Sequence, residues 1–99
     1  MQIISVRDKR VKKLVENPDL TSVKGFNELE CRKVTAMVAA IRVMTHPLQL
    51  GTVPAWRAHE LVPGQPGKWA LMVTGNFRLT FHVDLIKQEV RLLDYEDYH

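Results

Sequence analysis

The chain has 99 residues, of which 45% are hydrophobic, and this composition indicates one globular domain with a single core. Its net charge of +3 is modest, and every apolar segment is too short to cross a bilayer, which excludes a membrane-spanning protein. The first residues lack the charged and apolar regions of a signal peptide, and a single cysteine cannot form an internal disulfide. We therefore expect one domain over residues 1–99 in the reducing cytoplasm.

The first half of the chain predicts one short strand and two helices. Apolar residues predict a strand over Gln2–Val6, and helical periodicity predicts a helix over Arg7–Glu16. A second helix begins after Asn27, a suitable N-cap, and is closed by His46 and the proline that follows it. The apolar stripe of the second helix comprises Leu29, Val34, Met37, Val38, Ile41 and Met44.

In the second half the period of the apolar residues changes to two, which predicts antiparallel strands. Trp56 and Ala58 lie in the first of these strands, and Gly75-Asn76 makes a hairpin turn between the next two. In the last strand we expect Val90 and Leu92 to share one face. The predicted fold is an α+β domain of one short N-terminal strand, two helices and three to four antiparallel strands packed against the helices, with the other sheet face open to a ligand.

Positive charge is concentrated near the N-terminus and negative charge near the C-terminus. The first quarter of the chain holds Arg7, Lys9, Arg10, Lys12, Lys13 and Lys24. A basic region binds a polyanion such as RNA, because phosphates attract Lys and Arg and binding releases counterions. A solvated helix face explains the same pattern equally well, so charge alone leaves both interpretations open.

Polar residues of the second half are suited to cleaving RNA without a metal. Such cleavage needs proton transfer at the ribose 2′-hydroxyl and at the leaving 5′-oxygen, and a cation at the phosphate. His59 and His99 suit proton transfer, because the histidine pKa lies near neutral pH. Arg78 suits the phosphate, Asp97 can orient a histidine, and Tyr98 can stack on a base. The four histidines show no metal-ligand spacing, and we expect no cofactor.

Two segments of the chain resemble the HigB toxins of the RelE/ParE superfamily. The segment 67–81 reads Gly-Lys-Trp followed by an apolar alternation and Gly-Asn-Phe-Arg-Leu-Thr-Phe, and the segment 94–99 reads Asp-Tyr-Glu-Asp-Tyr-His. That family shows Gly-x-Trp, the same alternation, Gly-Asn-aromatic-Arg-Leu-Thr-Phe, and a Tyr-Glu-Asp-Tyr-His ending. Both segments stand in the family's order and at its separation.

The resemblance implies a RelE-like fold and the toxin of a type II toxin–antitoxin system. Such a toxin is a metal-independent endoribonuclease that cleaves translated mRNA in the ribosomal A site. The resemblance assigns proton transfer to His59 and His99, phosphate stabilisation to Arg78, histidine tuning to Asp97 and nucleotide binding to Tyr98. Val62 stands where the family has a lysine. We expect the substrate to be bound instead by Lys68, Arg57, Arg7, Lys9, Lys12 and Lys13.

The resemblance also implies partners. These are the ribosome with its mRNA and a HigA-like helix-turn-helix antitoxin. The toxin would reach operator DNA only through its complex with this antitoxin. No membrane partner is expected. Two alternatives remain open at this stage: a non-hydrolytic ParE-like toxin that binds DNA gyrase, and a degenerate relative that only binds an antitoxin.

Overall fold

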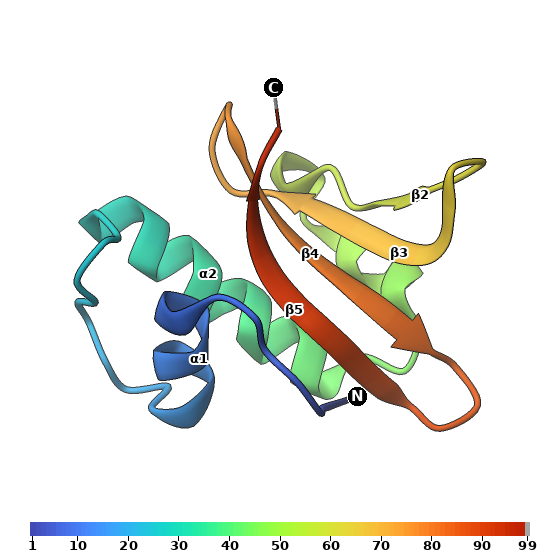
Figure 1. Ribbon diagram of the computed structural model, residues 1–99, viewed down its shortest axis with the longest axis horizontal. Helices are drawn as coiled ribbons and strands as arrows, with labels where there is room; N and C mark the ends of the chain where they lie inside the picture. The colour runs from blue at the N-terminus through green and yellow to red at the C-terminus, as the bar shows by residue number, and fades with distance from the viewer. Residues whose placement is uncertain (99) are drawn as a thin grey trace.

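One mixed sheet of five strands organises residues 1–98, the part of the chain that the computed structural model describes (Figure 1). The strands are β1 (Gln2–Ile3), β2 (His59–Leu61), β3 (Gln65–Met72), β4 (Phe77–Asp84) and β5 (Glu89–Asp97). Their order across the sheet is β1-β5-β4-β3-β2. β1 runs parallel to β5, and the other neighbouring strands are antiparallel. The expected α+β class is therefore confirmed.

Two α-helices and two short 3-10 helices accompany the sheet within residues 1–98. They are α1 (Lys9–Glu16), α2 (Glu28–Val43), η1 (Pro47–Thr52) and η2 (Pro54–Trp56). α1 begins later than expected because the Asp8 side chain caps it, accepting hydrogen bonds from the amides of Arg10 and Val11. Asn27 is confirmed as the N-cap of α2, where it forms a capping box with Glu30. No helix in this part of the chain is long and apolar enough to span a membrane.

The core lies between the helices and one face of the sheet. In Figure 1, α2 passes behind the strands. It buries Cys31, Val34, Met37, Val38 and Ile41 against the sheet residues Trp69, Leu71, Val73, Leu79, Phe81, Val90 and Leu93. Leu29, expected in this stripe, is instead 48% exposed, because Cys31 takes the buried position in the first turn of the helix.

Two expectations about the strands are wrong. Trp56 belongs to η2 rather than to a strand, since Pro54 at the start of η2 favours a helical turn, and β2 begins only at His59. Leu92 is 41% exposed while Leu93 is fully buried. Leu92 has a positive φ of 54° at a bulge in the pairing of β4 with β5. The extra residue shifts the alternation and brings Leu93 to the core side.

Both ends of the described chain are tied to the fold. The amino group of Met1 donates hydrogen bonds of 2.7–3.0 Å to the carbonyls of Ile41, Arg42 and Met44, at the C-terminal end of α2. That end carries the negative pole of the helix, which favours a bound cation. At the other end, the Tyr98 amide donates to the Asn76 carbonyl, 2.7 Å away, in the turn between β3 and β4.

Candidate functional site

The sheet face turned away from the helices, called the polar face below, carries a cluster of polar side chains. Residues that pair across neighbouring strands lie on the same face of a sheet. The pairing therefore arranges the polar face in three rows. These rows are Lys68, His82 and Arg91; then His59, Ala70, Thr80 and Asp94; then Met72, Arg78 and Glu96.

The sequence suggested an open face, but in the structure the middle of the polar face is covered. Ala70 and Thr80 are both fully buried. The Thr80 hydroxyl donates a short hydrogen bond to Oε2 of Glu96, and Nζ of Lys68 forms an ion pair with the same oxygen at 3.0 Å. Long side chains thus cover the centre of this face, and Lys68 keeps only 16% of its side chain exposed.

Glu96 is the acidic side chain at the centre of this cluster, and the sequence interpretation missed it. Burial alone would raise the pKa of Glu96, but the hydrogen bonds from Thr80 and Lys68 outweigh burial. The positive charges of Lys68 and Arg7 act in the same direction, so the pKa lies below its ordinary value and the group is ionised. The pairing of Glu96 with Arg78 across β4 and β5 reveals its place, and the sequence carries no local signal for that register.

Arg78 lies beside the turn between β3 and β4, as expected from its place after Gly75-Asn76. Its Nη1 donates to the Thr74 carbonyl at 2.8 Å and, at longer distances, to the carbonyls of Gly75 and Phe77. On the other side of the same turn, Nζ of Lys33 donates to the Val73 carbonyl at 2.9 Å. The turn is therefore fixed by two cations, which fixes the position of the Arg78 guanidinium.

The structure brings Tyr98 to Arg78. The guanidinium carbon of Arg78 lies 5.6 Å from the centre of the Tyr98 ring, within the range of a cation–π contact. Tyr98 is 39% exposed, so its ring keeps a surface on which a base could stack. His99, the second expected proton-transfer residue, lies outside the described residues.

Asp97 is not placed with Arg78. It pairs with Phe77 across β4 and β5, which puts it on the side of the sheet that faces the helices. The acidic side chain beside Arg78 on the polar face is Glu96 instead. Tyr98 follows the end of β5 and contacts Arg78, whereas Asp97 pairs with Phe77 on the helix side.

An aromatic cluster on the helix side holds this end of β5 in place. Tyr95 stacks on Phe77 with 5.0 Å between ring centres, and its hydroxyl donates to Glu30 of α2. Burial, with the nearby Glu30 carboxylate, raises the pKa of Tyr95 well above its ordinary value. The Arg10 guanidinium lies over the rings of Tyr95 and Phe26 and pairs with Asp8 at 2.7 Å, so Arg10 serves the fold.

His59 begins β2 on the polar face, opposite Ala70. Its Nδ1 lies 2.8 Å from the carbonyl of Arg57, and a donating Nδ1 leaves Nε2 as the proton acceptor. His59 on β2 and Arg78 on β4 are two strand spacings of about 4.8 Å apart across the sheet and two residues of about 3.3 Å apart along it. Their Cα atoms are therefore roughly 12 Å apart. Their side chains can reach inward from the two sides of a bound nucleotide.

Glu60 and Val62, which follow His59 in the chain, do not place an acid on the polar face. Glu60 pairs with Trp69, so it lies on the helix side, where its Oε2 accepts a 2.8 Å hydrogen bond from the Gly67 amide. Val62 lies in the loop between β2 and β3 and is 56% exposed. Lys68, expected to compensate for the lysine, is on the polar face, and Arg57 is exposed beside His59.

The other expected substrate-binding cations divide into two groups. Arg7 follows β1, donates its amide to the Leu93 carbonyl at 2.8 Å, and is close enough to Glu96 to lower its pKa. Lys9, Lys12 and Lys13 are exposed on α1, which packs against α2 on the helix side. Only Arg7 of this set therefore adds charge to the polar face.

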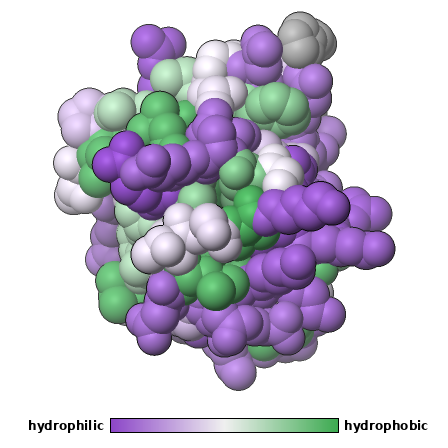
Figure 2. Space-filling model, turned by 90° about the vertical axis from the view of Figure 1, so that its left-hand side faces the viewer, coloured by the Kyte–Doolittle hydropathy of each residue, from purple (hydrophilic) through white to green (hydrophobic). Residues whose placement is uncertain are grey.

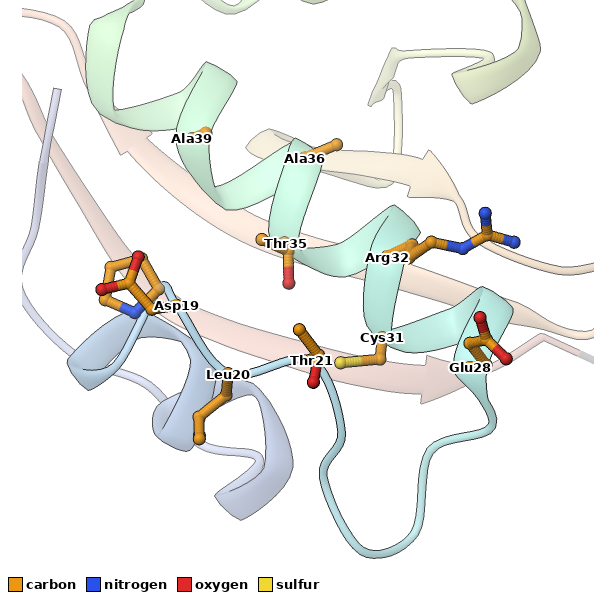
Figure 3. Close-up of a pocket in the computed structure, with 10 residues that line it drawn as sticks. Asp19, Leu20, Thr21, Glu28, Cys31, Arg32, Thr35, Ala36 and Ala39 are labelled. Carbon is orange, nitrogen blue, oxygen red and sulfur yellow. The ribbon is translucent and has the colours of Figure 1, made fainter.

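A cavity of about 470 Å³ lies away from this face. It is formed by α2 and the loop after α1, on the side of the molecule shown in Figure 2. Figure 3 shows Cys31 and Thr35 of α2 directed toward the loop residues Leu20 and Thr21, while Arg32 points away. Its lining contains no histidine, so it lacks the proton-transfer group that the polar face provides.

Across residues 1–98, no three His, Cys, Asp or Glu side chains gather in a way that could hold a metal ion. A scan of the chain against protein-family models finds no match, and a search of curated proteins finds none with significant similarity.

Proposed function

We propose that the protein is a RelE-type ribonuclease toxin of the HigB kind, which cleaves mRNA on the ribosome through its polar face. The observation that carries the proposal is the Arg78–Tyr98 contact on the same sheet face as His59 and Lys68. A phosphate-binding cation, a stacking ring and an imidazole on one face are the groups that metal-independent RNA cleavage requires.

In this proposal Arg78 stabilises the charge that develops on the phosphate in the transition state. Its guanidinium is held on the turn carbonyls by Nη1, so its position is fixed before the substrate arrives. Fixed cations of this kind contribute strongly to catalysis because they need no reorganisation during the reaction. His59 takes or gives a proton through Nε2, while Tyr98 holds a base by stacking.

The roles of the terminal residues are assigned by resemblance. His99 would be the second proton-transfer group, and Asp97, on the other side of β5, would act on the reaction through His99. As a ribosome-dependent enzyme the toxin would act in the cytoplasm, and a HigA-like antitoxin would inhibit it there. The proposal requires no metal and no cofactor.

The test uses translating ribosomes programmed with a defined mRNA, with the cut sites read by primer extension. We expect cleavage within codons by the unaltered chain and a loss of about 10²–10³-fold in rate for Arg78→Ala. Arg42→Ala is the matched control, because Arg42 also donates to a backbone carbonyl, that of Val15 at 2.6 Å, but lies on the helix side. The control should cleave like the unaltered chain.

Intact mRNA with the unaltered chain would overturn the proposal. If gyrase were inhibited under the same conditions, the ParE-like alternative would replace it. Equal losses in Arg78→Ala and Arg42→Ala would show that the rate reports folding rather than the polar face.

A further inference from the structure

The centre of the polar face has an ion pair between Lys68 and Glu96. Lys68 and Thr80 direct their donors at one oxygen, Oε2 of Glu96. An ammonium group and a hydroxyl converging on a single anionic oxygen form a donor set that also binds a phosphate oxygen. The carboxylate therefore lies where a phosphate of a bound strand would receive the same hydrogen bonds.

The charged side chains around this oxygen are mostly cations, although Asp94, which pairs with Thr80 across β4 and β5, is an acid on the same face. Arg7 adds positive charge from the edge of the sheet, and Arg78 pairs with Glu96 across β4 and β5. Yet the hydrogen bonds that Arg78 makes are to the carbonyls of the turn. A phosphate at this position would thus contact Lys68 and Thr80 and lie next to the cation that the proposed reaction uses.

We propose that Lys68 and Thr80 form a phosphodiester-binding site that Glu96 occupies in the free protein. Binding of RNA displaces the Glu96 carboxylate, so Glu96 competes with the substrate and lowers the affinity of the polar face for RNA. The inference rests on the proposed role of this face in RNA binding. It adds that the Glu96 carboxylate competes with RNA, and that one phosphate of the RNA binds beside Thr80, in the row next to that of Arg78.

The test measures the affinity of a short single-stranded RNA whose riboses are 2′-O-methylated, so that it cannot be cleaved. Glu96→Gln removes the negative charge but keeps the size of the side chain and an acceptor for Thr80. We expect this variant to bind the RNA about tenfold more tightly, which corresponds to about 1.4 kcal/mol. Glu16→Gln, an exposed position at the end of α1, controls for the same change in net charge and should bind like the unaltered chain.

The dependence of affinity on salt gives a second readout. In Glu96→Gln the Lys68 ammonium is free to release a counterion when it meets a phosphate. The slope of log K against log salt should therefore steepen by about 0.7, the value for one phosphate of a single strand. Lys68→Met or Thr80→Val in the Glu96→Gln background should abolish the gain in affinity.

If Glu96 merely positions Lys68, Glu96→Gln binds equally or more weakly with an unchanged slope, and the inference is overturned. Should that variant fail to fold, the carboxyl resonance of Glu96 in the unaltered chain provides the test. RNA that displaces the carboxylate shifts this resonance and raises its pKa, whereas an unmoved resonance in saturating RNA contradicts the site.

The two proposals fail separately. Tighter binding by Glu96→Gln without ribosomal cleavage by the unaltered chain would keep the phosphate site and refute the ribonuclease. Cleavage that depends on Arg78, with no tighter RNA binding by Glu96→Gln, would keep the ribonuclease and refute the phosphate site.

Discussion

The two faces of the sheet are built by different interactions, although the same strands make both. In β4, Leu79 and Phe81 are fully buried against the helices, while the residues between and beside them carry the polar face. The helix side is held by apolar contact, which depends on buried area and tolerates small shifts. The polar face is held by directed hydrogen bonds onto single atoms, such as Oε2 of Glu96. Stability and binding should therefore respond to different substitutions.

The largest expected effect is a difference in stability between variants of two adjacent residues of β4. Phe81→Ala removes a fully buried ring and should lower the free energy of unfolding by about 3–5 kcal/mol. His82→Ala, its neighbour on the polar face, should change this free energy by less than about 0.5 kcal/mol. Urea unfolding of both variants measures the difference. Similar losses in the two variants would mean that the polar face is also part of the core.

A smaller effect is expected from glycines in loops on opposite sides of the sheet. Gly25 has a φ of +97°, and an added Cβ would lie 2.8 Å from Cδ of Arg10. Gly25→Ala should therefore cost about 1–2 kcal/mol and shift Arg10 away from Phe26 and Tyr95. Gly75→Ala, in the turn beside the polar face, meets no atom within 4 Å and should be close to neutral. Thermal unfolding of the two variants compares them, and an equal loss would contradict this reasoning.

The smallest expected effect is a pH dependence that comes from Glu96 on the polar face. The pKa of Glu96 is lower in the folded chain than in the unfolded chain, so its contribution to stability is present above the ordinary glutamate pKa. That contribution is lost as the pH falls through the folded-state value. Glu96→Gln should therefore lose less stability on acidification than the unaltered chain. Parallel acid limbs in denaturant titrations of the two proteins would refute the assignment.

Local signals in the sequence predicted the elements well where one residue determines the geometry. Asn27 was identified as a helix cap because its side chain can accept the amide that the first turn leaves unpaired. Gly75-Asn76 was identified as a turn because these residues suit tight hairpins, and residues 73–76 do connect β3 to β4.

Features that depend on the pairing register between strands were harder to predict. The bulge at Leu92 reverses the faces of the residues that follow it, and no local pattern announces an extra residue. Asp97 was expected to orient a histidine of the site, but the register places Glu96, and not Asp97, beside Arg78. Residue type alone singled out His59, Arg78 and Tyr98 as candidates, whereas the central ion pair of the polar face required the sheet.

The order of the strands has a consequence for synthesis. β5 is the last strand along the chain, yet it lies between β1 and β4 in the interior of the sheet (Figure 1). Until residues 89–97 leave the ribosome, β1 has no partner and β4 has an unpaired edge, so the sheet cannot be completed. The Arg78–Tyr98 contact forms at the same late stage. The polar face, and any activity that depends on the Arg78–Tyr98 contact, is therefore complete only after residues 89–98 have been added to the chain.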